Sequence, residues 1–202
     1  MSYLKYTTQT FNKQNIIKKN NTINSIIALY NLYGHYKIQS HINIKDHSLI
    51  TASIAKKNNE NDKVILSSFL HNIGHLILNE HNKKADFLKK DLKHEEVGYR
   101  YLKRNYDNDV TRPILYHVKA KRYLCTINFN YYNNLSNISK NMFYLQGGKI
   151  EEDICNKLNL DPYFKDAINI KKYGDLANKI DFQDDKITMD YIEKLLNKYI
   201  II

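Results

Sequence analysis

The stretch from Val64 to His75 constrains the fold most, because it joins a helical apolar pattern to two histidines. Its apolar residues recur at helical spacing: Val64, Ile65, Leu66, Phe69, Leu70 and Ile73. This periodicity predicts a helix with one buried face. Gly74 follows, and we expect it to let the chain turn without Cβ strain. His71 then stands at the end of a buried helix, where an imidazole can hold a metal ion away from bulk water.

The rest of the chain also favours helices. Proline occurs only at Pro113 and Pro162, and there are six glycines in 202 residues. Alternating strand patterns are hard to find, whereas helical periodicity is frequent. Together these features predict an all-α protein of one domain. No apolar run approaches the roughly 18 residues that a membrane span requires.

The expected elements follow from apolar spacing and capping residues. A first helix is expected over 22–32 and ends at Gly34, and a second over 47–57 has Asp46 as its N-cap. The central segment forms the next helix, and others begin at His94 and run from Thr111–Pro113 to Leu124. The last helices are expected over 151–158, 165–179 and 190–202. Residues 36–45, 79–93 and 128–139 are expected to be loops, the second with one short helix at most.

Composition limits the classes of function. A net charge of +10 invites a nucleic-acid interpretation. However, the lysines are scattered and no nucleic-acid-binding motif accompanies them, so the charge suits a small anionic substrate better. Cys125 and Cys155 are too few for a disulfide framework or a cysteine-based zinc site. The polar N-terminus lacks the apolar core of a secretory signal, so we expect a soluble, cytoplasmic protein with no membrane partner.

Five potential metal ligands stand on or beside the expected helices: His47, His71, His94, His117 and Asp175. Histidine and aspartate are usual ligands for iron, manganese and zinc, and a helical bundle can gather them from several helices. Any one histidine taken alone is more simply a surface or hydrogen-bonded residue. His35, His41 and His81 lie in expected loops and are assigned that ordinary role.

The order of these residues resembles the HD-domain superfamily of metal-dependent enzymes. The segments His117–Cys125 and Leu145–Gly148 look like signatures of its phosphonate oxygenases. The resemblance spans roughly residues 33–177. It implies a single all-α HD domain over 1–202, with a core at about 22–180 and a C-terminal helix at about 190–202 packed on it. It also implies a mixed-valent pair of irons that uses O2 to cleave the carbon–phosphorus bond of a small hydroxylated phosphonate.

The resemblance also implies roles for individual residues. His47, His71 and Asp175 would hold one iron, and His94 and His117 the other. His75 and Lys121 would face the anionic group of the substrate. This suits Lys121, which lies one helical turn after His117. Further substrate contacts fall on Gln146 and Lys172, and the loop that carries Tyr36 and Gln39 would lie over the iron that binds O2.

Three departures from the family pattern affect this site. Asn72 stands where the family has the aspartate that bridges the two metals, and its neutral amide cannot replace an anionic bridge. The second iron site should therefore be weakened. Gln39 stands near the expected glutamate, in a loop one residue out of register with His47. Lys172 stands in place of an expected arginine. The lysine retains the positive charge but lacks the guanidinium that can make two parallel hydrogen bonds.

Three functions remain open at the level of sequence. The first is an active oxygenase for a small hydroxylated phosphonate. The second is a pseudoenzyme with a binding or regulatory role, favoured by Asn72. The third is a metal-dependent phosphohydrolase, in which a metal-bound hydroxide attacks a phosphate ester. The segment Lys121–Tyr123 favours the first over the third. No sequence feature fixes an oligomeric state.

Overall fold

The computed structural model describes residues 2–37, 42–82, 89–179 and 186–201, and for residues 2–13, 15 and 80–82 it describes the backbone alone. Within these ranges the chain forms helices and no strand, which confirms the expected all-α class. The helices are α1 (Ser2–Tyr33), α2 (Ile44–Lys57), α3 (Asp62–Leu70), α4 (Ile73–Asn82), α5 (His94–Leu102), α6 (Asn108–Ile127), α7 (Phe129–Asn133), α8 (Asn137–Leu145), α9 (Glu152–Asn159), α10 (Phe164–Ala177) and α11 (Met189–Tyr199).

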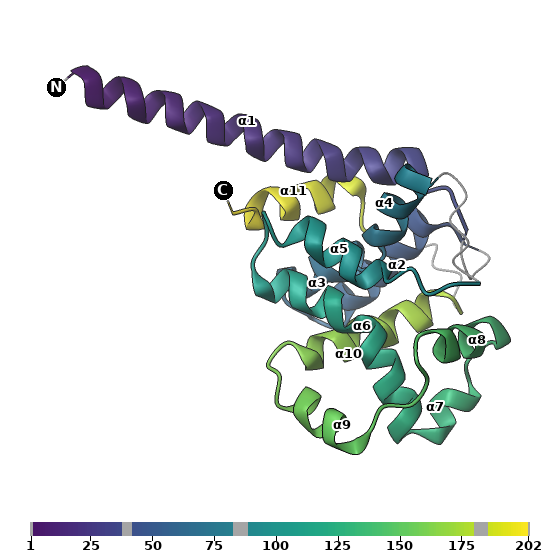
Figure 1. The fold of residues 1–202 in the computed structure, drawn as a ribbon. Helices are drawn as coiled ribbons and strands as arrows, with labels where there is room; N and C mark the ends of the chain where they lie inside the picture. Colours follow the sequence, from purple (N-terminus) through teal and green to yellow (C-terminus); the bar gives the residue numbers. More distant parts are fainter. Residues whose placement is uncertain (1, 38–41, 83–88, 180–185, 202) are drawn as a thin grey trace.

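Helix α1 is much longer than the apolar pattern predicts. Its C-terminal half buries Ile23, Ile26 and Tyr30, and the Tyr30 hydroxyl donates to the backbone oxygen of Phe69 at 2.7 Å. Its N-terminal half extends away from the other helices (Figure 1). The helix ends at Gly34, as expected, where the amide donates to the Tyr30 carbonyl oxygen at 3.0 Å.

Two helices begin earlier than expected because other residues cap them. Asn43, and not Asp46, caps α2, since its side-chain oxygen accepts from the Asp46 amide at 2.8 Å. Asp107 caps α6 by accepting from the Val110 amide at 3.2 Å. Pro113 therefore lies inside α6 and does not begin it.

The central stretch forms two helices, α3 and α4, joined by a turn at His71 and Asn72. Gly74 does not make this turn, because it lies inside α4. It is needed for close approach: a Cβ atom at Gly74 would lie 1.9 Å from the carbonyl oxygen of His94. The first turn of α5 therefore packs directly on the backbone of α4.

The segment after α6 also departs from expectation. Residues 128–139 were expected to form a loop, yet most of them belong to α7 and α8. The side chains of Asn128 and Ser136 cap these two helices. Short helices with caps but few buried residues give little apolar periodicity, which is the signal that the sequence argument used.

The arrangement of helices creates the site. Helix α10 packs on α2 and α6, and α3 packs on the same two helices. The main core surrounds α3 and α4, and a smaller cluster lies between α6, α9 and α10. Helix α11 packs on α3 and α1. Among the described helices, none is long and apolar enough to cross a membrane.

Candidate functional site

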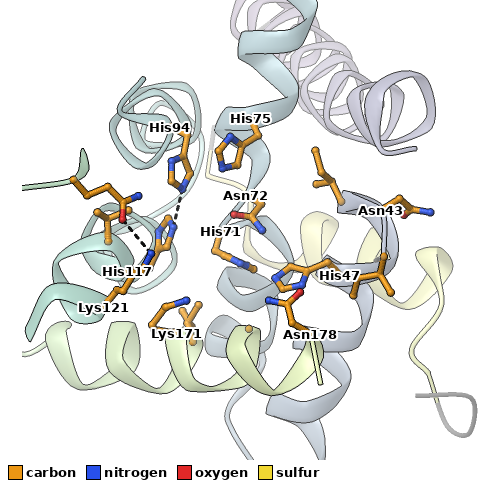
Figure 2. A pocket seen from close by; sticks show the side chains of 16 residues that line it. Asn43, His47, His71, Asn72, His75, His94, His117, Lys121, Lys171 and Asn178 are labelled. Carbon is orange, nitrogen blue, oxygen red and sulfur yellow. Dashed lines mark hydrogen bonds between the residues drawn. The ribbon is translucent and has the colours of Figure 1, made fainter. Parts of the chain in front are cut away.

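A cavity of about 90 Å³ lies where α2, α4, α5, α6 and α10 meet (Figure 2). Its polar wall is formed by Asn43, His47, His71, Asn72, His75, His94, His117, Lys121, Gln146, Lys171 and Asn178. A water molecule needs roughly 10–15 Å³ of such space, so the cavity has room for several waters or one small ligand.

Five histidines come together in this pocket from five different parts of the fold. His47 lies on α2, His71 in the turn after α3, His75 on α4, His94 at the start of α5 and His117 on α6. All five are nearly buried. The His75 and His94 rings stack with centroids 3.8 Å apart, and those of His94 and His117 lie 5.0 Å apart.

Backbone contacts fix the tautomers of two of these rings. The Nδ1 of His71 lies 2.7 Å from the Ser68 carbonyl oxygen, and the Nδ1 of His117 lies 2.6 Å from that of Ile114. A carbonyl only accepts, so each Nδ1 carries the proton and each Nε2 has an unprotonated lone pair. The Nε2 of His94 lies 3.0 Å from that of His117 and therefore donates to it (Figure 2).

Burial keeps the imidazoles neutral. Desolvation lowers the pKa of His47 to about 4, helped by the charge of Lys171. It lowers the pKa of His71 to about 3, with the neighbouring His47 adding to the effect. The pKa values of His75, His94 and His117 are also held well below 6.5, mainly by burial. Neutral imidazole is the form that binds metals.

Two lysines share the pocket wall. Lys121 is 5% exposed, and among the described residues its ammonium makes one hydrogen bond, a long one of 3.5 Å to the Gln146 side-chain oxygen. Burial, and then the charge of Lys171, lowers the pKa of Lys121 to about 7. Lys171 donates to Asp175 Oδ1 at 2.5 Å, and the hydroxyl of Tyr131 donates to the other oxygen of that carboxylate.

Asp175, expected as a metal ligand, does not line the cavity. The residue that faces the His47–His71 pair is Gly174, where a Cβ atom would lie 3.5 Å from His47 Nε2 and 3.6 Å from His71 Nε2. Likewise Lys172 is exposed, and Lys171 lines the cavity in its place. Both corrections have one cause, since adjacent residues on a helix point about 100° apart.

The other predicted residues divide between the pocket and its surroundings. Asn72, His75, Lys121 and Gln146 line the cavity. Tyr36 is 43% exposed and does not. Gln39, like His41 and the side chain of His81, falls outside the described residues.

Lys171, Gly174 and Asn178 line the wall although the sequence did not predict them there. The spacing of Lys171 and Asp175, four residues apart on a helix, was a signal that could have pointed to their ion pair.

The donor set fits one divalent metal ion in kind, but it does not fit an iron pair. Neutral imidazoles suit a single iron or zinc ion. Among the described residues that line the cavity there is no carboxylate to bridge two ions. Within the described part of the chain, no three His, Cys, Asp or Glu side chains already converge as a metal site. An ion held here would need further ligands from solvent or from a bound molecule.

Comparison with known proteins gives the family. The HD domain model matches residues 44–155, from the start of α2 into α9. A hydroxymethylphosphonate dioxygenase from Gimesia maris is 32% identical over 155 residues, which are 77% of each chain.

Two further relatives extend the comparison. A [1-hydroxy-2-(trimethylamino)ethyl]phosphonate dioxygenase (glycine-betaine-forming) from Leisingera caerulea is 28% identical over 78% of this chain and 81% of its own. The uncharacterized protein L432 of Acanthamoeba polyphaga mimivirus is 31% identical over 98% of this chain and 90% of its own.

These matches confirm the family resemblance that the sequence motifs indicated. Because the family model covers more than half of the chain and a relative at 32% identity covers most of it, this chain belongs to the HD domain family.

Proposed function

We propose that this chain is an HD-domain oxygenase that binds a small hydroxylated phosphonate in the histidine-lined pocket and cleaves its carbon–phosphorus bond with O2. The observation that carries the proposal is the shared wall of five neutral imidazoles and two lysines. The names of two relatives, both phosphonate dioxygenases, support the same class of substrate.

The lysines would bind the phosphonate. Lys121 brings a buried ammonium whose hydrogen bond to Gln146 is long and leaves its donors underused. Lys171 is held at the wall by Asp175. Hydrogen bonds between ammonium and phosphonate oxygens are charge-assisted and strengthen in a water-poor pocket. The small cavity limits the substrate to a few heavy atoms beyond the phosphonate.

The imidazoles would hold one iron, with His94 and His117 already in contact. Iron supplies the electron transfer to O2 that no side chain of the pocket can supply. The backbone contacts of His71 and His117 keep their Nε2 atoms unprotonated and fix the orientation of the rings. Burial of these residues keeps bulk water out of the pocket.

A second function is favoured by one observation: neither Asn72 nor Gly174 supplies a carboxylate to the pocket. A pocket that binds the phosphonate but does not hold iron firmly would act as a binding or regulatory protein on the same fold. Both functions require binding of the phosphonate, but only the oxygenase turns it over.

Anaerobic loading with Fe²⁺, followed by mixing with O2 and hydroxymethylphosphonate, tests the proposal. We expect O2 uptake that depends on the phosphonate and is matched by release of inorganic phosphate. Binding of the phosphonate without O2 uptake would establish the second function instead. Release of phosphate from a phosphate monoester without O2 would point to the phosphohydrolase, and His117→Asn is the control for activity outside the pocket.

A further inference from the structure

Arg122 stands next to Lys121 on α6, but its side chain reaches a different part of the fold. Lys121 lines the cavity (Figure 2), whereas the guanidinium of Arg122 contacts the turn that follows α8. There its Nε donates to the Gly148 carbonyl oxygen at 2.8 Å, and its Nη2 donates to those of Gly147 at 3.0 Å and Lys149 at 3.2 Å. One side chain therefore donates to three successive backbone carbonyls, as the five-donor fork of a guanidinium allows.

Two glycines give the turn the shape that this contact requires. Gly147 and Gly148 have φ values of +102° and +62°, in the left-handed region that favours glycine. A Cβ atom at Gly147 would lie 3.2 Å from both Cζ and Nη2 of Arg122, so the guanidinium packs against bare backbone. At Gly148 the nearest atom to such a Cβ is Tyr144 Cδ1, at 4.0 Å. Of the two glycines, Gly147 is therefore the one that the close approach of Arg122 requires.

The turn places Gln146 at the pocket. Gln146 is 6% exposed and lines the cavity, with its side-chain oxygen 3.5 Å from the Lys121 ammonium. Within the described part of the chain, this long contact is the one hydrogen bond that the Gln146 side chain makes. A contact of that length is too weak to hold a buried amide in place. The position of Gln146 is therefore set by its backbone, which continues directly into the residues that Arg122 holds.

We infer that Arg122 is a positioning residue, which clamps the turn at 147–149 and thereby holds Gln146 beside Lys121 at the pocket wall. Lys121 and Arg122 are consecutive on α6, so one helix determines where both the ammonium and the clamped turn lie. The side-chain oxygen of Gln146 then orients an ammonium that meets the oxyanion of the ligand. Without the clamp, Gln146 loses this position and the pocket binds an oxyanion less tightly.

The effect of losing Arg122 should remain local, because a second contact anchors the chain just beyond the turn. The Ile150 amide donates to the Thr126 hydroxyl at 3.0 Å, and the Ile150 side chain is buried in the smaller core cluster. Neither contact involves Arg122. A variant without the guanidinium is therefore expected to keep its helices and to change the turn.

The side-chain amide signals of Gln146 in a ¹H–¹⁵N NMR spectrum report its position without metal, O2 or ligand, and the Gln146→Ala variant identifies them. We expect these signals to move toward the values of a free amide in Arg122→Met. Lys119→Met is the matched control, because it removes a positive charge from an exposed position of the same helix, and it should leave the signals in place. Unmoved signals in Arg122→Met, with circular dichroism showing an intact fold, would overturn the inference.

The two glycines give an independent test that keeps the guanidinium. In Gly147→Ala the new methyl group meets Arg122, so the Gln146 signals should shift as they do in Arg122→Met. Gly148→Ala is the matched control, since this residue also has a positive φ but its methyl group has room. Equal shifts in the two variants would mean that backbone strain, and not the contact with Arg122, displaces Gln146.

The consequence for the ligand rests on the proposed function, because it takes a phosphonate as the ligand of the pocket. Calorimetry with hydroxymethylphosphonate and the Fe²⁺-loaded full chain, under anaerobic conditions, measures binding without turnover. We expect Gln146→Ala to weaken binding about 10-fold, on the scale of one hydrogen bond to a charged group. Arg122→Met should weaken it by most of the same factor, and Lys119→Met should bind normally.

The double variant separates positioning from a general loss of structure. In a chain that already carries Gln146→Ala, Arg122→Met should change the affinity by less than about 2-fold, because the two residues act as a unit. Equal losses with and without Gln146 would show that Arg122 does not act through it, and would overturn the inference. If the unaltered chain binds no phosphonate, the proposed function fails, while the Gln146 signals still decide whether Arg122 positions this residue.

Discussion

At the scale of single residues, the pocket depends on which way a side chain points from α10. Lys171 lines the cavity and Lys172 is exposed, although both are lysines on one helix. We expect Lys171→Met to weaken binding of hydroxymethylphosphonate ~10- to 100-fold, because a hydrogen bond to a charged group contributes about 1.5–3 kcal/mol. Lys172→Met is the matched control and should bind normally. Calorimetry on both variants measures this, and equal losses would remove Lys171 from the site.

The same rotation explains how far the sequence could predict the site. Four metal-ligand histidines, together with His75, were predicted from residue type, order and family resemblance, and all five line the cavity. Asp175 and Lys172 were predicted from the family resemblance, whereas Gly174 and Lys171, their neighbours along α10, line the cavity. A shift of one residue keeps plausible residue types but moves the side chain about 100° around the helix. Only the packing of α10 on α2 and α6 distinguishes Gly174 from Asp175.

At the scale of elements, the contact between α4 and α5 is set by backbone and not by side chains. A methyl group at Gly74 would lie 1.9 Å from the His94 carbonyl oxygen and 2.7 Å from its carbon. We expect Gly74→Ala to lower the free energy of unfolding by at least 1–3 kcal/mol, the usual cost of overpacking. Gly98→Ala is the milder comparison, because its nearest neighbour is the Ile73 Cγ2 atom at 3.2 Å. Urea unfolding of both variants gives the difference, and equal stability would contradict the close approach.

Element boundaries show what local sequence can predict. The helices from His94 and at 151–158 were expected almost as they occur, since apolar spacing and charge bias marked them. The start of α2 was placed at Asp46 because aspartate caps helices well, yet Asn43 does so too and lies one turn earlier. Gly74 was expected to make a turn, because glycine often does. Its actual role, close contact with α5, depends on residues that lie 20 positions further along the chain. Long-range contacts of this kind leave no local signal.

At the scale of the whole molecule, the buried histidines make the metal-free protein sensitive to acid. Their pKa values lie below 6.5 in the folded chain, at about 4 for His47 and about 3 for His71. The unfolded chain therefore binds more protons, and stability is lost as the pH falls from about 6.5 toward these values. The lowered pKa of His47 alone corresponds to about 3 kcal/mol of folding free energy, which is lost in full once the pH falls below about 4, at 1.36 kcal/mol per pKa unit.

Glu95 acts in the opposite direction. Burial raises its pKa from 4.5 to about 7, so its contribution is present at low pH and is lost as the pH rises through about 7. Five histidines outweigh this one carboxyl group. Urea midpoints at pH 7.5, 6 and 5 should fall with pH, and His47→Gln should make the fall shallower. A midpoint that stays constant to pH 5 would show that the rings are not buried as neutral groups.

The absence of a wall carboxylate among the described lining residues has a kinetic consequence. Lys171, whose charge Asp175 offsets in part, and the protonated fraction of Lys121 make the pocket wall positive. In a chain of net charge +10 this wall attracts a dianion before any contact forms. The association rate of hydroxymethylphosphonate should therefore exceed that of an uncharged analogue of the same size. This advantage should shrink as salt shortens the range of the field, which is about 10 Å at 0.1 M ionic strength. Stopped-flow measurements of the association rate constant at several ionic strengths would show this effect. They separate the rate of binding from the equilibrium affinity.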